Sequence, residues 1–405
     1  MKRWKKISLT LLAVIVLSQL PFAYRRYRLG KLAAAIQRVS SERPAHQTTA
    51  DAYTEYKGVM HVHSFLGGHS TGTFQDIIEA ATLNELNFVV MTEHPARSFD
   101  TAAMTLQGLH ATVLFVNGNE VVTANQDRLL VMPGDETAAR AASTSTQELL
   151  DNKHATRSLA FAAYPLEFKN WNATGFDGVE VYNVFTNARQ INPLVTFCDG
   201  LWAWRGNPDL LFATFYNRPA DALKKWDDAM ATRNRRLVAT AGNDAHANVG
   251  LSLNDSSGKT LLGVRLDPYE RSFRLVRMHV LIESGKQLDT DSLLSALREG
   301  HCFIGFDLFG YTEGFRFAAT NGADRRIQGD EINLANGVHL LVNVPASSRV
   351  VLFKNGSIAQ DWSGAYGKQF NVTEKGVYRV EVYLPQLPKP VGDQPWIISN
   401  PIYVR

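Results

Sequence analysis

Cysteine is scarce in this sequence: among its 405 residues, Cys198 and Cys302 are the two that occur. So few cysteines exclude a disulfide-stapled scaffold and a zinc site built from thiolates. Internal repeats and low-complexity tracts are also missing. Apolar residues make up 45% of the chain and charged residues 20%. This composition excludes a disordered, collagen-like or coiled-coil protein, and the length allows for two domains.

Acidic residues are nearly missing from the first 46 positions. This segment holds ten lysines and arginines and one acidic residue, Glu42, so its net charge is +9. The rest of the chain holds 32 basic and 38 acidic residues, a net charge of −6. The overall charge of +3 therefore comes from the leader, and the body gives no electrostatic reason to expect nucleic acid as a partner.

The leader contains an uncharged, mostly apolar run of 18 residues, Ile7–Tyr24, with basic residues on both sides. As a helix it would span about 27 Å, slightly less than the bilayer core of about 30 Å. The run has no polar face, which argues against a buried helix of a soluble protein. A cleaved signal peptide needs small residues at its cleavage site, and Pro21-Phe22-Ala23 is a poor match.

We therefore expect residues 1–46 to form an uncleaved membrane anchor, with a short helix from about residue 31 followed by a polar linker that ends near Ala50. Basic residues flank both ends of the run, so the charge rule does not decide its orientation. We expect the body to lie outside the cytoplasm, in the periplasm or at the cell surface.

Residues 52–306 alternate between apolar stretches typical of strands and segments with helical spacing. Nearly continuous apolar runs are expected of strands covered by helices on both faces. The strand candidates are Gly58–His63, Asn87–Thr92, Val113–Asn117, Leu159–Tyr164, Gly178–Tyr182, Leu237–Ala241 and Met278–Ile282; the helix candidates are Phe74–Leu86, Pro219–Asn234 and Asp291–Glu299. Thr73 can cap the first helix, with Asp76 as its capping-box partner. The alternation predicts an α/β fold with a parallel sheet closed into a barrel.

The pattern changes after about residue 310. Val338–Val344 and Val377–Leu384 read as strands, and Asn355-Gly356 marks a turn. Short strands over residues 311–405 predict a small β-sandwich as a second domain.

Metal-binding side chains cluster at the ends of the predicted strands. In a parallel barrel the carboxyl ends of the strands share one rim, where active sites form. Imidazole nitrogens and carboxylate oxygens that arrive there from distant segments suit divalent ions such as Zn²⁺, Mn²⁺ or Fe²⁺. The candidate metal ligands are His61, His63, His69, His94, Glu120, Asp244 and His246.

Four motifs in this order resemble the PHP (polymerase and histidinol phosphatase) family over residues 52–306: His61-Val62-His63-Ser64, Thr92-Glu93-His94, Glu120 and Asn243-Asp244-Ala245-His246. The resemblance implies a distorted seven-stranded (β/α) barrel with a metal cluster at its rim and phosphoesterase chemistry. It places six of the candidates at ligand positions, and His69 where some members have a ligand histidine and others an aspartate. It also implies a structural or supporting role for Glu180.

The sequence departs from the family at Tyr164-Pro165, where members commonly carry His-Pro. A phenol is a poor metal ligand at neutral pH, so we expect one or two bound ions rather than three. His154, the one histidine in the interval 121–163, is the alternative candidate for the vacant position.

Substrate contacts are expected from the loop Gly67–Thr73 and from Tyr164. The loop opens a helix, so its backbone N–H groups, together with Ser70 and Thr71, could meet a phosphate. The alternative is that its glycines only let the chain turn. The Tyr164 hydroxyl could reach a phosphate oxygen at the rim, or the ring could merely pack beside Pro165.

The predicted function is hydrolysis of a phosphate ester by a metal-activated water, with His61, His63, Asp244 and His246 as the catalytic residues. The sequence has no Gly-x-Ser-x-Gly elbow and no P-loop, so serine-triad and nucleotide-kinase chemistry lack support. The expected substrate is a small-molecule or cell-envelope phosphate ester. Two alternatives stay open: another metal-assisted hydrolase on the same scaffold, and a degenerate protein that binds metal or ligand without turnover.

The leader generates the first testable prediction. The full chain should fractionate with membranes and resist carbonate washing, because the apolar run is long enough for a tilted or slightly thinned fit. Sequencing of the mature N-terminus provides the control. A terminus just after Ala23 would instead show an exported, soluble protein.

Overall fold

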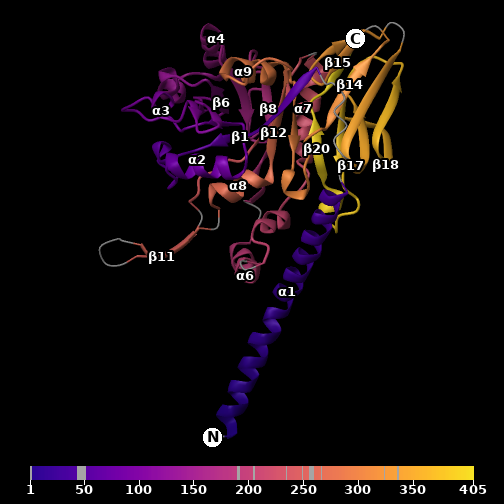
Figure 1. The fold of residues 1–405 in the computed structure, drawn as a ribbon. Helices are drawn as coiled ribbons and strands as arrows, with labels where there is room; N and C mark the ends of the chain where they lie inside the picture. The colour runs from indigo at the N-terminus through magenta and orange to yellow at the C-terminus, as the bar shows by residue number, and fades with distance from the viewer. Residues whose placement is uncertain are drawn as a thin grey trace.

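The computed structural model describes residues 2–42, 52–188, 192–203, 206–233, 235–248, 250–254, 260–265, 267–322, 324–334 and 337–405. Figure 1 shows a body of strands and helices from which one long helix, α1 (Lys2–Ser41), extends. The N-terminus lies at the far end of this helix, and the C-terminus lies on the body.

The described elements confirm a mixed α/β protein. The other α-helices are α2 (Phe74–Leu83), α3 (Thr101–Met104), α4 (Thr146–Thr156), α5 (Val184–Ala188), α6 (Pro193–Ala203), α7 (Ala220–Arg233), α8 (Tyr269–Leu275) and α9 (Thr290–Glu299). Short 3₁₀ helices are η1 (Phe65–Gly67), η2 (Glu136–Ser143), η3 (Asp209–Thr214), η4 (Asp307–Phe309) and η5 (Val391–Asp393).

The strands are β1 (Tyr53–Val62), β2 (Phe88–Met91), β3 (Gly108–His110), β4 (Val113–Val116), β5 (Asn119–Val122), β6 (Arg128–Met132), β7 (Leu159–Ala163), β8 (Gly178–Asn183), β9 (Val238–Gly242), β10 (Gly250–Asn254), β11 (Thr260–Arg265), β12 (Arg277–Glu283), β13 (Cys302–Gly305), β14 (Arg316–Thr320), β15 (Arg325–Ile327), β16 (Glu331–Ile332), β17 (Val338–Lys354), β18 (Ser357–Val372), β19 (Gly376–Tyr383), β20 (Pro395–Ser399) and β21 (Ile402–Val404). All seven strands predicted between residues 58 and 282 are present, with β1 beginning five residues earlier than expected.

The strands form two large sheets and a separate hairpin, β10–β11. The first sheet has the order β15-β14-β17-β19-β20-β13-β12-β1-β2-β4-β3, with β18 beside β17, β21 beside β19 and β16 beside β21. The second has the order β5-β6-β7-β8-β9. Isolated bridges join the two sheets at Val62–Ala245 and at Glu93–Asn119. The described strands therefore form open sheets that meet at their ends, and the expected closed barrel is not confirmed.

The expectation of a parallel sheet is confirmed for some neighbouring strands and wrong for others. β1, β2 and β4 are parallel to one another, as are β7, β8 and β9. However, β6 runs antiparallel to both of its neighbours, and β12 runs antiparallel to β1. A tight turn between β5 and β6 explains the first reversal, because a short hairpin can join only antiparallel strands. Thr123 closes this turn by donating its N–H to the carbonyl of Asp127 at 2.9 Å.

Helix α2 shows how local sequence sets an element's ends. Thr73 accepts a hydrogen bond from the Asp76 N–H, and Asp76 accepts one from the Thr73 N–H, which confirms the predicted capping box. The helix ends at Leu83, three residues earlier than predicted. Glu85 takes a left-handed backbone conformation (φ 51°), which turns the chain into β2.

The strands after residue 311 extend the first sheet. β20 pairs with β13, so the sheet runs across the predicted domain boundary. The long hairpin β17–β18 turns at Asn355-Gly356, whose φ angles of 49° and 81° suit a two-residue turn between twisted strands. The turn is thus confirmed, whereas the division into domains 52–306 and 311–405 stays a prediction.

Buried arginine–carboxylate pairs hold the C-terminal strands against α7. Arg379 in β19 donates to both carboxylate oxygens of Asp227 in α7, at 2.9 and 2.7 Å. It also donates to Glu381 at 2.7 Å, and Arg218 binds the same carboxylate at 2.7 and 2.6 Å. Such bidentate hydrogen bonds offset the free-energy cost of burying the charged groups. They also fix α7 and the adjoining β9 against the C-terminal strands.

Helix α1 continues from the apolar run into the body. The expected separate helix from residue 31 is not found, because one helix with Pro21 inside it runs without a break to Ser41. Its first part is long and apolar enough to cross a membrane and is not buried by the body. Farther along, the face formed by Leu29, Leu32, Ala35 and Val39 is buried. The predicted linker lies largely outside the described residues.

A second buried ion cluster lies at the centre of the first sheet. His279 in β12 lies 2.8 Å from Glu55 through Nδ1 and 3.3 Å from Asp307 through Nε2. Arg277 and Arg316 face the same two carboxylates, at 3.3 and 2.5 Å. Burial alone would lower the pKa of His279, but Asp307 and Glu55 outweigh it and raise the pKa to about 9.

The contribution of His279 to the free energy of unfolding should therefore be lost as the pH rises. A pKa raised from 6.5 to about 9 stabilises the folded state fully below pH 6.5, and this contribution disappears as the pH passes 9. At about 1.4 kcal/mol per pKa unit, the free energy of unfolding should fall by about 3 kcal/mol across this window. Denaturant unfolding of the full chain in detergent, between pH 6 and about 9.5, measures the change.

His279→Gln should be less stable than the wild type at pH 6 and should lose most of the pH dependence. The exposed His339 in β17 offers a matched control, and His339→Gln should keep the wild-type profile. A His279→Gln protein with the wild-type slope would assign the pH dependence to other groups.

Candidate metal centre

The candidate ligands lie where the two sheets meet. His61 is the next-to-last residue of β1 and His63 directly follows the strand, while Asp244 comes two residues after β9. The His63 N–H donates to the Ala245 carbonyl at 3.1 Å, and the Ala245 N–H donates to the His61 carbonyl at 3.2 Å. These two bonds hold the segment after β9 beside the end of β1.

An inner group of four buried side chains surrounds one point. His61, His63, Glu120 and Asp244 each present a ligand atom, and these atoms lie within 4.8 Å of one another. Nε2 of His61 lies 3.3 Å from Glu120 Oε2 and 3.4 Å from Asp244 Oδ1. Nε2 of His63 lies 3.4 and 3.5 Å from the same two oxygens. These four side chains, which belong to the seven predicted ligands, lie together in the structure, and their role as metal ligands stays a prediction.

An outer group adds two histidines toward the solvent. His63, His94 and His246 also present ligand atoms within 4.8 Å of one another. The His63 ring stacks on His94 and on His246, with centroid distances of 4.6 and 4.3 Å. The side chains of His94 and His246 are 22% and 14% exposed, so they form the edge of the site that solvent reaches.

A layer of hydrogen-bonded residues fixes the inner group. Glu180 in β8 contacts Nδ1 of His61 at 2.6 Å, which leaves Nε2 facing the cluster. Asn183 donates to Glu180 at 3.0 Å and to Asp244 at 3.2 Å. Glu180 therefore has the supporting position that the resemblance implied.

Two further donors hold the carboxylates. Arg128 in β6 donates to Glu120 Oε1 at 2.9 Å, and the hydroxyl of Tyr164 donates to Asp244 Oδ2 at 2.6 Å. Each bond occupies one carboxylate oxygen and leaves the other, Oε2 or Oδ1, toward the histidines. Tyr164 thus lies beside the inner group, and its hydroxyl binds a carboxylate.

Buried charges shift the protonation of the cluster strongly. Burial opposes charge on His61, but Glu180, Asp244 and Glu120 outweigh it and raise the pKa of its imidazole well above the ordinary value. Burial lowers the pKa of His63 to about 3, so that its ring is neutral at neutral pH. The histidines keep the pKa values of Glu120 and Asp244 low despite burial, so both carboxylates are ionised.

The donor set fits a divalent metal ion. Nε2 of His63 and Oδ1 of Asp244 are buried, and neither has a hydrogen-bond partner among the described residues. Buried polar atoms are rarely left in this state without a bound ion or water. Neutral imidazole nitrogen and ionised carboxylate oxygen are ligands of Zn²⁺, Mn²⁺ and Fe²⁺.

The backbone at the site is strained. His61, Tyr164 and Asp244 have φ angles of 63°, 49° and 48°, in the left-handed region that residues other than glycine seldom occupy. Such conformations cost about 1–3 kcal/mol each and cluster at functional sites. Here they turn three side chains from three different strand ends toward the same point.

Gly242, the last residue of β9, leaves room for the support of His61. A Cβ atom at this position would lie 1.8 Å from Glu180 Oε1 and 2.8 Å from the Cβ of His61. The contact between Glu180 and His61 therefore requires glycine at residue 242.

The predicted substrate-binding loop holds the Asp244–His246 segment. Ser70 donates its hydroxyl to the carbonyl of His246, and Thr71 donates to the carbonyl of Ala247 at 2.7 Å. A phosphate contact by Ser70 and Thr71 stays a prediction, as it does for Tyr164.

Two other histidine predictions have different outcomes. His69 is exposed, and its ring lies 5.1 Å from that of His94. It belongs to neither of the ligand groups found among the described residues, so its role as a ligand stays a prediction. The side chain of His154 lies outside what the structure describes.

Sequence reasoning gave no role to Arg128 or to Glu93. Glu93 lies beneath the ligands and accepts hydrogen bonds from the backbone N–H of Ser64 at 3.1 Å and from the hydroxyl of Thr105 at 2.8 Å. These bonds fix the loop after His63. The sequence did offer one signal for Arg128, because an arginine at the start of an otherwise apolar strand indicates a charged partner nearby.

No family model and no curated protein sequence matches the chain. Among solved structures, PsfC from Pseudomonas syringae PB-5123 is similar over 62% of this chain and 92% of its own, with 13% identity and a TM-score of 0.35. A proposed metal-dependent phosphoesterase from Bifidobacterium adolescentis ATCC 15703 is similar over 51% of this chain and 89% of its own, with 14% identity and a TM-score of 0.28. These similarities are low, so the function has to be inferred from the residues of the site.

Gly242→Ala tests the support of the cluster. The added methyl group must displace Glu180 and with it His61, so bound Zn²⁺ after dialysis should fall several-fold, and overpacking should cost roughly 1–3 kcal/mol of stability. Elemental analysis and thermal unfolding measure the two effects.

Gly200→Ala in α6 is the matched control, because nothing lies within 4 Å of a Cβ atom there. It should keep its metal and unfold at or slightly above the wild-type temperature. Unchanged metal content and stability in Gly242→Ala would contradict the described packing.

Proposed function

We propose that this protein is a metal-dependent phosphoesterase that hydrolyses a phosphate ester with water. The buried inner group carries this proposal, because its ligand atoms lie within 4.8 Å of one another, and Asp244 Oδ1 and Nε2 of the neutral His63 have no hydrogen-bond partner among the described residues. The order of the motifs along the chain, which resembles the PHP family, adds the reaction class.

The residues that would hold the metal are His61, His63, Glu120 and Asp244, with His94 and His246 completing the solvent edge. We propose one or two ions, of Zn²⁺, Mn²⁺ or Fe²⁺. When bound, a divalent ion supplies positive charge that lowers the pKa of water and neutralises phosphate oxygens.

The chain's own residues orient the reactants. The bonds from Arg128 and Tyr164 prevent Glu120 and Asp244 from rotating away from the histidines. Burial lowers the pKa of His94, so its partly exposed ring is neutral at neutral pH and suits a ligand at the edge of the site. Arg128 keeps N–H donors beyond the one that binds Glu120, and these suit a phosphate oxygen.

Water is the nucleophile that the described site favours. The hydroxyl of Ser64, the nearest serine in sequence to the ligands, is bound to the buried Glu93 at 2.5 Å. Hydrolysis then forms a bond from the water oxygen to phosphorus and breaks the bond to the ester oxygen, and the released alcohol takes up a proton.

One observation favours a second candidate, a binding protein without turnover. Tyr164 stands where the family commonly has histidine, and its hydroxyl is bound to Asp244. Burial, together with the charge of Asp244, raises the pKa of Tyr164, so the phenol stays protonated and cannot replace an imidazole as a ligand.

The location that we propose follows from α1. With the apolar run in a bilayer, the body lies close to the membrane surface, and we propose that it faces the outside of the cytoplasm. A small-molecule or cell-envelope phosphate ester is then the proposed substrate.

Metal analysis and a phosphate-ester assay test the function together. The purified full chain should retain metal after dialysis, and it should hydrolyse para-nitrophenyl phosphate until a chelator removes the metal. Added Mn²⁺ or Zn²⁺ should restore the activity. Asp244→Asn and His63→Ala should each lower the metal affinity by tenfold or more, because the first removes the negative charge of a ligand and the second removes a ligand atom.

His339→Ala, an exposed histidine in β17, is the control and should keep both metal and activity. Metal content that is unchanged in a folded Asp244→Asn protein would overturn the site. Retained metal without turnover on monoesters and diesters would favour the binding protein, and activity that survives chelation would point to other chemistry.

A further inference from the structure

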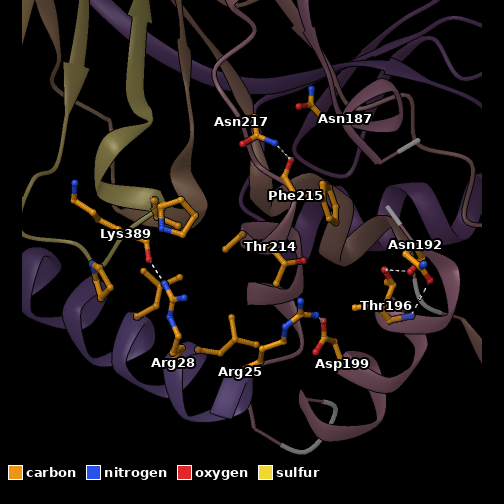
Figure 2. Close-up of a pocket in the computed structure, with 17 residues that line it drawn as sticks. Arg25, Arg28, Asn187, Asn192, Thr196, Asp199, Thr214, Phe215, Asn217 and Lys389 are labelled. Atoms are coloured by element: carbon orange, nitrogen blue, oxygen red, sulfur yellow. Dashed lines mark hydrogen bonds and ion pairs between the residues drawn. The ribbon is translucent and has the colours of Figure 1, made fainter. Parts of the chain in front are cut away.

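A cavity of about 510 Å³ lies between α1, α6, η3 and residues 388–391. Figure 2 shows Arg25 and Arg28 from α1 on one side of it, with Lys389 and Thr214 on other sides. The volume lies in the range of small-ligand pockets. The proposed phosphoesterase chemistry does not use it, because none of the residues of the inner or outer ligand group lines it.

The position of the cavity along α1 places it at a membrane surface. The apolar run ends at Tyr24, and the lining residues of α1 begin with Arg25 and end with Leu32. On a helix that rises about 1.5 Å per residue, Arg28 lies about 6 Å beyond the run and Leu32 about 12 Å beyond it. A headgroup layer is about 5–8 Å thick on each side of the hydrocarbon core. With the run in a bilayer, the cavity begins at the level of the lipid headgroups.

Helix α6 supports this placement independently. Trp202 donates its ring N–H to the side chain of Gln19 at 3.1 Å, so the end of α6 lies beside the last turns of the apolar run. Nearby, Leu201 is 65% exposed and Phe197 39% exposed. Figure 1 shows α6 on the side of the body from which α1 extends. Exposed apolar residues with an adjoining tryptophan are typical of a helix at a membrane interface.

The lining combines cations with an apolar wall. Arg25 binds Asp199 at 2.5 Å, and Arg28 donates to the backbone carbonyl of Lys389. These bonds use one N–H of each guanidinium, and a guanidinium has five. The Lys389 side chain lies 3.2 Å from Asp393 and is largely exposed. Three cations against one lining acid leave an excess of positive charge.

The apolar wall of the cavity comes from the docked part of α1. Leu29 and Leu32 line it and are buried. This wall closes the cavity on the side away from the bilayer, whereas the side nearest the bilayer adjoins the apolar run that ends at Tyr24. A ligand that reaches from the cations to this run carries a negative charge on one part and a hydrocarbon on another. A soluble phosphate matches only the cations.

We propose that this cavity binds the phosphate headgroup of an anionic phospholipid from the bilayer that holds α1. The phosphate lies against Arg28, with Arg25 and Lys389 as further donors, and the glycerol and acyl chains extend from it back toward the bilayer, beside the apolar run that ends at Tyr24. This site is separate from the proposed phosphoesterase site, and it rests on the insertion of α1 in a membrane.

Lipid retention by the full chain tests the proposal. The protein is reconstituted into nanodiscs of equal parts dioleoylphosphatidylglycerol and dioleoylphosphatidylcholine, and native mass spectrometry counts the lipids that it retains on release. The wild type should retain phosphatidylglycerol at least threefold over phosphatidylcholine. Arg28→Gln should lower this ratio toward one, because it removes the central cation.

Two further variants separate the cavity from general attraction to charged lipid. Arg26→Gln removes the same charge from the same helix at an exposed position outside the lining, and it should keep the wild-type ratio. Thr214→Trp fills the cavity from an exposed lining position without changing charge, and it should lower retention as Arg28→Gln does.

Equal retention of the two lipids, or an equal effect of Arg26→Gln and Arg28→Gln, would overturn the proposal. Displacement of the lipid by millimolar glycerol phosphate would assign the cavity to a soluble phosphate instead. Failure of the chain to insert into nanodiscs would also overturn the lipid-binding proposal, because the proposal requires α1 to span the bilayer. Each of these results leaves the metal analysis of the proposed phosphoesterase site unaffected.

Discussion

The structure depends on bringing three carboxylates, Glu120, Glu180 and Asp244, together around buried histidines. Burying like charges side by side is unfavourable unless cations and hydrogen-bond donors surround them. His61 lies between all three, and Arg128 and Asn183 supply donors at the periphery. The left-handed backbone conformations at the strand ends make this arrangement possible, because they turn the side chains toward a common point.

The strands could be predicted because their apolar runs are continuous and their ends are polar. Which strands pair with one another could not be predicted. β6 reverses direction because a short turn follows β5, and the pairing of β13 with β20 joins residues nearly a hundred positions apart. Nothing in the apolar pattern of Phe303 and Ile304 indicates which later strand will lie beside them, because any buried strand would satisfy the pattern.

The clustering of the inner group could be predicted from the order of its residues along the chain, since each lies at or after the end of an apolar run. The residues that support them depend on register. Glu120 lies opposite Leu130, and Val122 lies opposite Arg128, so Arg128 is a diagonal neighbour of Glu120 on the same face of the sheet. Arg128 and Glu120 are neighbours only because β5 and β6 are antiparallel. The prediction of a parallel sheet therefore gave no reason to expect this contact. The hydrogen bond from Tyr164 to Asp244 could not be predicted, because it joins residues 80 positions apart whose side chains meet only in the folded chain.

If the apolar run of α1 spans a bilayer, as we propose, the unbroken course of the helix fixes the height of the body above that bilayer. A flexible tether would let the site sweep through solution, whereas a helix docked through Leu29 and Leu32 holds it at one height. A molecule that diffuses within the membrane then meets the site in two dimensions, at a far higher effective concentration than the same molecule in solution. In the proposed phosphoesterase, the anchor would thereby contribute to substrate choice by limiting which molecules reach the site, without contacting the substrate.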